Sequence, residues 1–187
     1  SKKLLAPREG DDLELDWEAA INFVGRCQNL PKNNKQELVS NHPDDRGGFI
    51  YFPGSSMAGE RESTDGSKQL RSYGSMSYAG LLSFIYAEMK PDDKWVQAAR
   101  EWINAHYSVK ENPGMGEQGL YYYYHTMAKA LSLSGVDVIQ KTDGTKANWR
   151  RDLAKKLFNF QRADGSWINE NGRWWERDPV LVTAYAV

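Results

Sequence analysis

The chain has 187 residues, enough for one ordinary domain with a sizeable core, and its 40% hydrophobic and 26% charged residues are typical of globular proteins. Because 24 basic residues balance 25 acidic ones, the net charge of -1 gives no support for binding to nucleic acid or to an anionic membrane surface. The single cysteine, Cys27, excludes a disulfide within the chain and a zinc site built from several thiolates, and no apolar run approaches the roughly 20 residues of a membrane span.

The chain opens with a polar segment and a one-sided helix. Residues 1–15 are polar and charged, and we expect them to form an extended arm ahead of one domain over residues 16–187. Asp16 can cap a first helix that runs to about Leu30 and ends before Pro31. Its apolar residues recur at helical spacing, so one face should be buried and the other wet.

Loops and a more apolar helix follow. Residues 49–52 (FIYF) could form a short strand, and the Asp-Gly pair at 65–66 predicts a turn. Residues 72–89 predict a second helix that is apolar on most of its surface and must therefore be enclosed by neighbours. The Asp-Asp pair at 92–93 then caps another one-sided helix.

The stretch from Asn112 to Gly135 organises the rest of the chain. A glycine-rich loop leads into a helix with four consecutive tyrosines, Tyr121 to Tyr124, followed by His125. Because apolar and aromatic residues cover nearly all sides of this helix, it should also be enclosed by other helices. Gly135 is suited to cap its C-terminus.

The C-terminal part repeats the alternation. Asp-Gly at 143–144 and Asn-Gly at 171–172 each predict a hairpin, and Asn148 caps a third one-sided helix between them. Asp178 then caps an apolar helix that has completed only about two turns at Val187. Since buried helices rarely end so soon, we expect the natural protein to continue, or another chain to complete this layer.

Three one-sided helices, beginning at Trp17, Trp95 and Trp149, are each followed by a loop and an apolar helix. Outer helix, loop and inner helix, three times over, indicate a repeat of helical hairpins. We therefore predict an all-α fold in which one-sided helices surround more apolar ones, with short β-hairpins in the connecting loops.

Gln161, Gly165 and Trp167 follow a one-sided helix and resemble the Gln-Trp motif of the squalene-hopene cyclase and protein prenyltransferase superfamily. Gln28, followed by residues 47–49 (GGF), resembles a stretched, degenerate copy. A glutamine at a helix end can donate to unpaired carbonyls and a tryptophan can cover that contact, so the expected role of this motif is structural.

Residues 71–87 and 112–131 are also similar to bacterial proteins with prenyltransferase and squalene-oxidase repeats, and the resemblance covers most of residues 17–187. It implies an α/α toroid, in which inner helices ring a central cavity and outer helices wrap them. About six hairpins normally close that ring, so the three hairpins here would form a partial toroid.

The catalytic motifs of these families are not matched. Cyclases of this group protonate their substrate with Asp-x-Asp-Asp, whereas Pro43-Asp44-Asp45 lacks the first aspartate. Prenyltransferases hold zinc with Asp, Cys and His, but Cys27 lies within a helix without an Asp-x-Cys arrangement. We therefore expect no metal site and no cofactor, and whether the chain is an enzyme stays open.

In a toroid, the N-termini of the inner helices face the mouth of the cavity, where unpaired N–H groups favour anions or electron-rich groups. The catalytic candidates placed there are His125, Tyr121, Glu117 and Asp178. The substrate-binding candidates are Arg71, Tyr73, Tyr124, Trp174 and Trp175, with Ser75 and Glu176 beside them. The alternative is structural: the carboxylates cap helices, and the tyrosines and His125 are hydrogen-bonded core groups.

Two further histidine sites have structural readings as well. His106 ends an outer helix and should interact with its C-terminal dipole. His42, Asp44 and Asp45 could bind a metal or supply an acid, but a solvated loop of turn-forming residues is the more frequent outcome.

Three functions fit these observations. The first is binding or conversion of a hydrophobic, isoprenoid-like molecule in an aromatic-lined central cavity. The second is a non-catalytic ligand-binding or protein-interaction module. The third is a carbohydrate-active toroid that binds an oligosaccharide with tryptophans and carboxylates. A cavity lined by aromatics and methionine favours the first, and paired carboxylates beside exposed tryptophan favour the third. The sequence does not determine the compartment.

Overall fold

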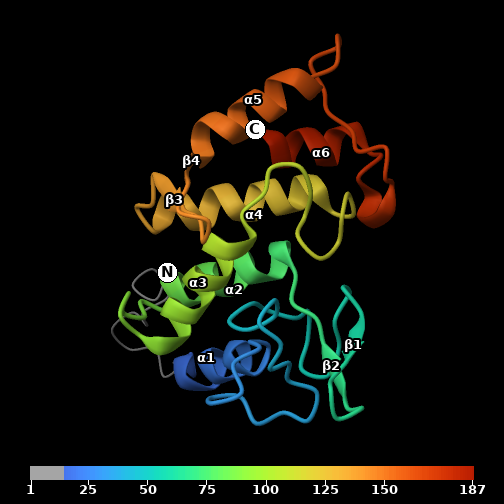
Figure 1. Cartoon of the computed structure of the whole chain (residues 1–187). Helices are drawn as coiled ribbons and strands as arrows, with labels where there is room; N and C mark the ends of the chain where they lie inside the picture. Colours follow the sequence, from blue (N-terminus) through green and yellow to red (C-terminus); the bar gives the residue numbers. More distant parts are fainter. Residues whose placement is uncertain (1–14) are drawn as a thin grey trace.

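The computed structural model describes residues 15–187, so the predicted arm at 1–15 lies almost wholly outside the described residues. Within that range the chain forms six α-helices and two small antiparallel β-hairpins, which confirms a mostly helical fold (Figure 1). The helices are α1 (Trp17–Arg26), α2 (Gly74–Tyr86), α3 (Lys94–His106), α4 (Leu120–Leu133), α5 (Trp149–Phe160) and α6 (Pro179–Ala186). The short elements are β1 (Glu60–Glu62), β2 (Lys68–Leu70), β3 (Val138–Gln140), β4 (Lys146–Asn148) and the single-turn 3₁₀ helix η1 (Arg173–Trp175).

Side-chain caps set the beginnings of four helices, as the sequence predicts. Asp16 accepts from the backbone N–H of Ala19, Asp93 from Trp95 and Asn148 from Arg151, at 2.8 to 2.9 Å. Asp178 accepts from the N–H groups of Val180 and Leu181. Each cap pairs an N–H group that has no partner inside its own helix.

Gly135 ends α4 as predicted. It has φ +65°, and Val136 N donates to Leu131 O while Gly135 N donates to Ser132 O. This pair of bonds is the Schellman arrangement, which a residue with positive φ just after the helix makes possible.

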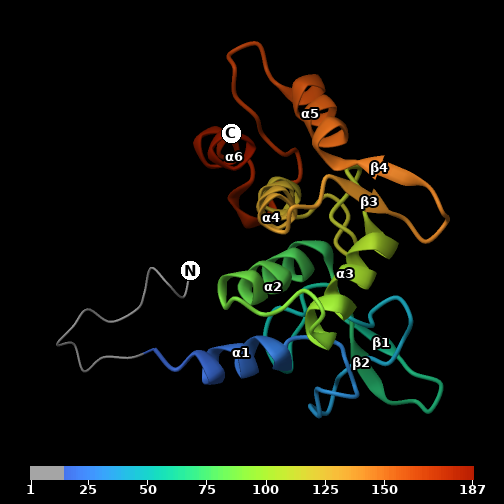
Figure 2. The same ribbon diagram turned by 90° about the vertical axis from the view of Figure 1, so that its left-hand side faces the viewer.

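The helices form two layers. α2 packs against α4, and α4 packs against α6, so the three apolar helices form a row. Figure 2 views α4 and α6 almost end-on, with α3 and α5 both lying on one side of that row. α1 packs on α2 at one end of the row. Along the chain, α1, α3 and α5 thus alternate with the more apolar helices α2, α4 and α6.

The two central inner helices are the most enclosed. α4 buries eight residues, including Tyr121, Tyr123 and Tyr124, and α2 buries seven. α6 differs from the prediction of a buried helix, because only Val182 is buried and Val180 is exposed. α6 packs against α4, and its Thr183 Oγ1 accepts from the Trp167 backbone N–H, so the helix is only partly covered.

The loops confirm one predicted hairpin and correct another. β3 pairs with β4 around Asp143-Gly144 as predicted, and β1 pairs with β2 around Asp65-Gly66, where the sequence indicated only a turn. The hairpin predicted at Asn171-Gly172 is wrong: Gly172 has φ -75°, and η1 follows it. Residues 49–52 form no strand but only two isolated bridges, Gln28 with Phe49 and Phe52 with Ser55.

Gln161 and Trp167 connect the end of α5 to the following loop, but each makes a different hydrogen bond from the one predicted. Gln161 Nε2 donates to the loop carbonyl of Gly165 at 2.9 Å, and Trp167 Nε1 donates to the helix carbonyl of Leu157 at 2.9 Å. The tryptophan, and not the glutamine, therefore pairs a carbonyl of the helix. Gln28 makes the corresponding bond to Gly47 O at 3.0 Å, and a further one to Trp95 O at 2.9 Å in the next outer helix.

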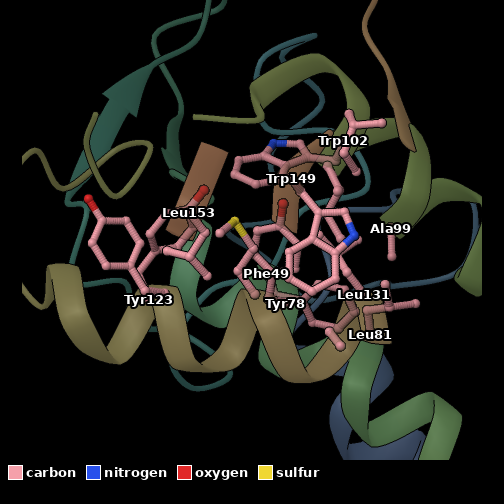
Figure 3. Close-up of a cluster of buried hydrophobic side chains, with 14 of the residues drawn as sticks. Phe49, Tyr78, Leu81, Ala99, Trp102, Tyr123, Leu131, Trp149 and Leu153 are labelled. Carbon is pink, nitrogen blue, oxygen red and sulfur yellow. The ribbon is translucent and has the colours of Figure 1, made fainter. Parts of the chain in front are cut away.

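One apolar cluster joins the layers (Figure 3). The ring of Phe49, which is 1% exposed, meets Phe84 edge-on at 5.6 Å and lies against Gly80 of α2. On the other side of α2, Tyr78 meets Tyr123 of α4 at 5.6 Å. Within the described residues, no helix is long and apolar enough to cross a membrane.

Gly80→Ala tests this packing. Alanine usually favours a helix over glycine by about 1 kcal/mol, but a Cβ atom at Gly80 would lie 2.4 Å from the Phe49 ring. Because Phe49 is enclosed, we expect Gly80→Ala to destabilise the protein by about 1–3 kcal/mol, measured by urea unfolding. Ser83→Ala on the same helix is the control, with a change within about 0.5 kcal/mol. Equal stability of Gly80→Ala and the wild type would show that Phe49 can move aside.

Candidate functional site: an aromatic pocket at the start of the inner helices

A pocket of about 270 Å³ opens where α2 and α4 begin. Its walls come from the first turns of these helices, from the loop before α4, from the loop before α2, from η1 and from α6. The lining residues are Tyr51, Met57, Tyr73, Ser75, Met76, Asn112, Met115, Gln118, Gly119, Tyr122, Trp174 and Tyr185. Five are aromatic, three are methionine and none carries a carboxylate, an imidazole or a basic group.

The glycine-rich loop builds one wall of this pocket. Asn112 N donates to Gly116 O at 2.8 Å, which closes a tight turn, and Gly114, Gly116 and Gly119 all have positive φ. Gly119 is the residue before α4 and has φ +63°, which a residue with a side chain rarely adopts. The glycines therefore let the loop fold back and present Met115 and Gln118 to the pocket.

Asn112 joins this loop to the start of α2. Its Oδ1 accepts from the backbone N–H of Ser75 at 3.0 Å. Its Nδ2 donates to Gln118 O at 3.0 Å and to Ser75 Oγ at 3.3 Å. One amide thus caps α2 from the following hairpin and fixes two residues of the pocket wall.

Tyrosine hydroxyls supply the polar part of the pocket. Burial, followed by the neighbouring phenols of Tyr122 and Tyr51, raises the pKa of Tyr73 well above its usual range. Burial and the phenols of Tyr185 and Tyr51 likewise raise the pKa of Tyr122. Both groups are therefore neutral at physiological pH, so that they can donate a hydrogen bond to a ligand oxygen.

The pocket rim at Trp174 is held in an unusual backbone conformation. Trp174 and Trp175 have φ of 63° and 65°, a region that costs residues with side chains of order 1 kcal/mol each. Trp174 is 47% exposed and lines the pocket, whereas Trp175 is 81% exposed. Arg173 stacks on the Trp174 ring at 5.0 Å and donates to Gln118 Oε1 at 2.7 Å.

The buried residue after these tryptophans holds the turn in place. Glu176 is 0% exposed, and its Oε1 accepts from the backbone N–H of Tyr122 at 2.9 Å. Its Oε2 accepts from Asn169 Nδ2 at 2.7 Å. Burial raises the pKa of the Glu176 carboxyl, while the bonds from Asn169 and from the start of α4 lower it in part. Glu176 is therefore a cap for α4 supplied by the next hairpin.

Of the predicted site residues, Tyr73, Ser75 and Trp174 come together in the pocket. Arg71 is turned away and donates to Ala58 O at 3.3 Å. Glu117 is exposed and contributes only its carbonyl, which accepts from Asn169 Nδ2. Asp178 is occupied as the cap of α6.

The other four predicted residues lie elsewhere on α4 or on the surface. Tyr121 is buried against Tyr124 at 5.7 Å, and burial raises its pKa to about 12. The Tyr124 hydroxyl donates to Val109 O at 2.8 Å, so it anchors the loop after α3. His125 is half-buried beside Tyr185, in a neighbouring groove. Trp175 is a surface residue and does not line the pocket.

Most of the pocket wall was missed by sequence reasoning. Asn112, Met115 and Gln118 belong to the glycine-rich loop, which the sequence marks, but the acidic Glu117 of that loop is the residue that turns outward. Tyr122 is the one tyrosine of the four that faces the pocket. Nothing in the local sequence places Tyr51, Met57 or Tyr185 beside them, because these residues come from distant segments.

The acidic loop after α1 is more ordered than a solvated loop. Asp45 is 1% exposed and accepts from Ser40 Oγ and from the Ser72 backbone N–H. Its Oδ2 also forms an ion pair with Arg61 Nε at 2.8 Å. His42 Nδ1 lies 2.7 Å from Arg61 Nη1. The buried ion pair therefore ties this loop to β1 and to the entry of α2. No cluster of three potential metal ligands occurs among the described residues.

The remaining predicted histidine and the cysteine have structural positions. His106 ends α3, where its Nδ1 lies 2.9 Å from Trp102 O and its ring stacks on Trp102 at 4.3 Å. Cys27 is buried, and burial raises the pKa of its thiol to about 11. This thiol is therefore protonated at neutral pH.

Comparison with known proteins identifies no relative. No family model matches the chain, and neither a curated protein nor a solved structure matches it significantly. The geometry of the pocket is thus the basis for the functional argument.

Glu176→Gln gives a pH-dependent test of the buried cap. A raised pKa means that the folded chain holds the proton more tightly than the unfolded chain, so ionisation of Glu176 disfavours the folded state. The free energy of unfolding of the wild type, minus that of Glu176→Gln, should therefore fall as the pH rises above about 4.3. Urea unfolding of both proteins at a series of pH values measures this difference in free energy of unfolding. A difference that rises with pH would mean that the hydrogen bonds outweigh burial.

Trp175→Gly tests the backbone strain. Glycine adopts positive φ without a steric cost, and the exposed Trp175 ring has little packing to lose. We expect Trp175→Gly to be about 1 kcal/mol more stable than Trp175→Ala, which keeps the strain and also lacks the ring. Thermal unfolding of the two variants measures the difference. Equal stabilities would show that the turn carries no strain at this residue.

Proposed function

We propose that the pocket at the start of α2 and α4 binds a small, uncharged, hydrophobic molecule. The observation that carries this proposal is the lining: five aromatic residues and three methionines surround about 270 Å³ of space, with no charged group among them. Concave apolar sites with a few convergent polar groups are typical of small-molecule binding. Methionine side chains adapt their shape to varied apolar ligands.

The proposed ligand is isoprenoid-like and carries an uncharged oxygen. Support comes from the neutral hydroxyls of Tyr73 and Tyr122, which can donate to a carbonyl or hydroxyl oxygen. Asn112 and Gln118 add amide groups to the wall. A carboxylate or phosphate ligand would lack a basic partner in this pocket, and its burial without one would be costly.

We further propose that the chain is a partial α/α toroid related to the squalene-hopene cyclase and prenyltransferase superfamily. Support comes from the three successive outer and inner helices, and from the matching bonds of Gln28 to Gly47 and Gln161 to Gly165. In that arrangement the pocket occupies the mouth of the central cavity.

The proposal is for binding without chemistry at this pocket. The candidate acids Glu117, Glu176 and Asp178 do not line it, and the last two are engaged as helix caps. His125 faces a different groove. A carbohydrate-active site is the second candidate because Trp174 offers an exposed ring at the rim, but Glu176 and Asp178 are engaged as helix caps and Glu117 does not line the pocket.

Met57→Trp tests the proposal. Met57 is half-buried at the pocket wall, so a larger ring there should fill part of the space. We expect farnesol, a neutral isoprenoid alcohol, to bind the wild type and to bind Met57→Trp about tenfold more weakly, which corresponds to about 1.4 kcal/mol. Isothermal titration calorimetry measures both affinities.

The matched control is Met89→Trp. Met89 is also half-buried but lies beyond the opposite end of α2, so this variant should bind farnesol as the wild type does. Cellopentaose is the probe for the carbohydrate alternative. Binding of cellopentaose without farnesol, or an equal loss in both methionine variants, would contradict the proposal.

A further inference from the structure

A second hollow lies next to the aromatic pocket along the same helix. It also has a volume of about 270 Å³ and is an open groove lined by α4, α5, α6 and the exposed Val187. α4 contributes Tyr122 to the pocket and His125, Lys129 and Ser132 to the second hollow. These positions follow one another at steps of three, four and three residues, so they form one stripe along one side of α4.

Tyr185 of α6 belongs to both hollows. Its ring centroid lies 5.7 Å from that of Tyr122 and 5.8 Å from that of His125. Because Tyr122 and His125 are one helical turn apart, the Tyr185 ring lies across the stripe where the two hollows meet.

The second hollow, like the first, has largely apolar walls. Its walls include Leu153 and Leu157 of α5 and Ala128 of α4, which are apolar. Lys129 is exposed, so its methylene groups can line the hollow while its ammonium group stays in water. The two hollows together thus offer an apolar path along α4 that is longer than either alone.

We infer that the two hollows form one channel for an elongated, uncharged apolar chain, and that Tyr185 sets the length of chain the site accepts. The inference rests on the proposed function, since it assigns a shape to the ligand of the aromatic pocket. A chain that enters past Trp174 lies along Tyr122 and ends at the Tyr185 ring. Moving that ring aside joins the first hollow to the second.

The test uses a series of straight-chain primary alcohols: hexanol, octanol, decanol, dodecanol and tetradecanol. Displacement of the neutral dye Nile red reports their affinity. In the wild type, affinity should rise about fourfold for each additional buried methylene until the chain reaches Tyr185, and then level off. In Tyr185→Ala the rise with chain length should continue to longer alcohols than in the wild type.

Further variants keep this test decisive. Tyr185→Leu also opens the path with a smaller loss of packing, and Tyr185→Phe should keep the wild-type length limit. Leu157→Trp, combined with Tyr185→Leu, fills the second hollow and should restore the limit. Circular dichroism confirms that each variant is folded.

The outcomes separate the two claims. An unchanged length limit in both Tyr185→Ala and Tyr185→Leu overturns the channel and leaves pocket binding intact. Failure of Nile red, farnesol and every alcohol to bind the wild type overturns the proposed function itself. A length limit that moves in Tyr185→Phe would also contradict the inference, because the ring would still be present.

Discussion

Each of the first two inner helices is capped by a side chain from the next hairpin, and the layered fold depends on these caps. Asn112, in the loop before α4, accepts from the backbone N–H of Ser75 at the start of α2. Glu176, in the turn before α6, accepts from the backbone N–H of Tyr122 at the start of α4. Unpaired N–H groups at a buried helix end are costly. Each following hairpin supplies the side-chain oxygen that accepts from such an N–H group in the preceding inner helix. The caps therefore tie the start of each of these helices to the hairpin that follows it.

These caps also decide the chemistry of the pocket. The starts of inner helices would ordinarily favour a bound anion, but the N–H groups of Ser75 and Tyr122 already have protein partners. What remains open to a ligand beside them is aromatic, thioether and neutral hydroxyl surface. The same interaction that aligns the helices thus favours an uncharged apolar ligand over a phosphate or carboxylate.

The alternation of helices could be predicted from sequence because each element carries its own signal. Asp16, Asp93, Asn148 and Asp178 stand before runs with helical periodicity, and these local caps formed as expected. The pattern of α4, apolar on nearly all sides, likewise predicted its enclosure. Local hydrogen bonds and residue spacing are sufficient for such features.

The site could be predicted only in part, since it depends on contacts between distant segments. Tyr73 and Trp174 were expected near an inner-helix start and are there, but Tyr51 and Tyr185 reach the pocket through the tertiary fold. The hairpin expected at residues 171–172 failed for a similar reason. Glu176 is drawn inward to α4, which forces the two residues before it into a turn of positive φ. A cap 54 residues away in sequence overrode the local turn preference.

The partners of each cap explain why one is an amide and the other a carboxylate. Asn112 must accept from the Ser75 N–H and also donate to Gln118 O, and an amide does both. Both oxygens of Glu176 accept, one from the Tyr122 N–H and one from the Asn169 amide, whose Nδ2 also donates to Glu117 O. A glutamine at position 176 has one oxygen and one NH₂ group. Its NH₂ group would face the donor of either Asn169 or Tyr122, and a buried N–H group would be left unpaired. A carboxylate suits this buried position because each of its two oxygens accepts one hydrogen bond, from the Tyr122 N–H in α4 and from Asn169 Nδ2 in the loop. Placing Glu176 there also requires the preceding turn, in which Trp174 and Trp175 have positive φ.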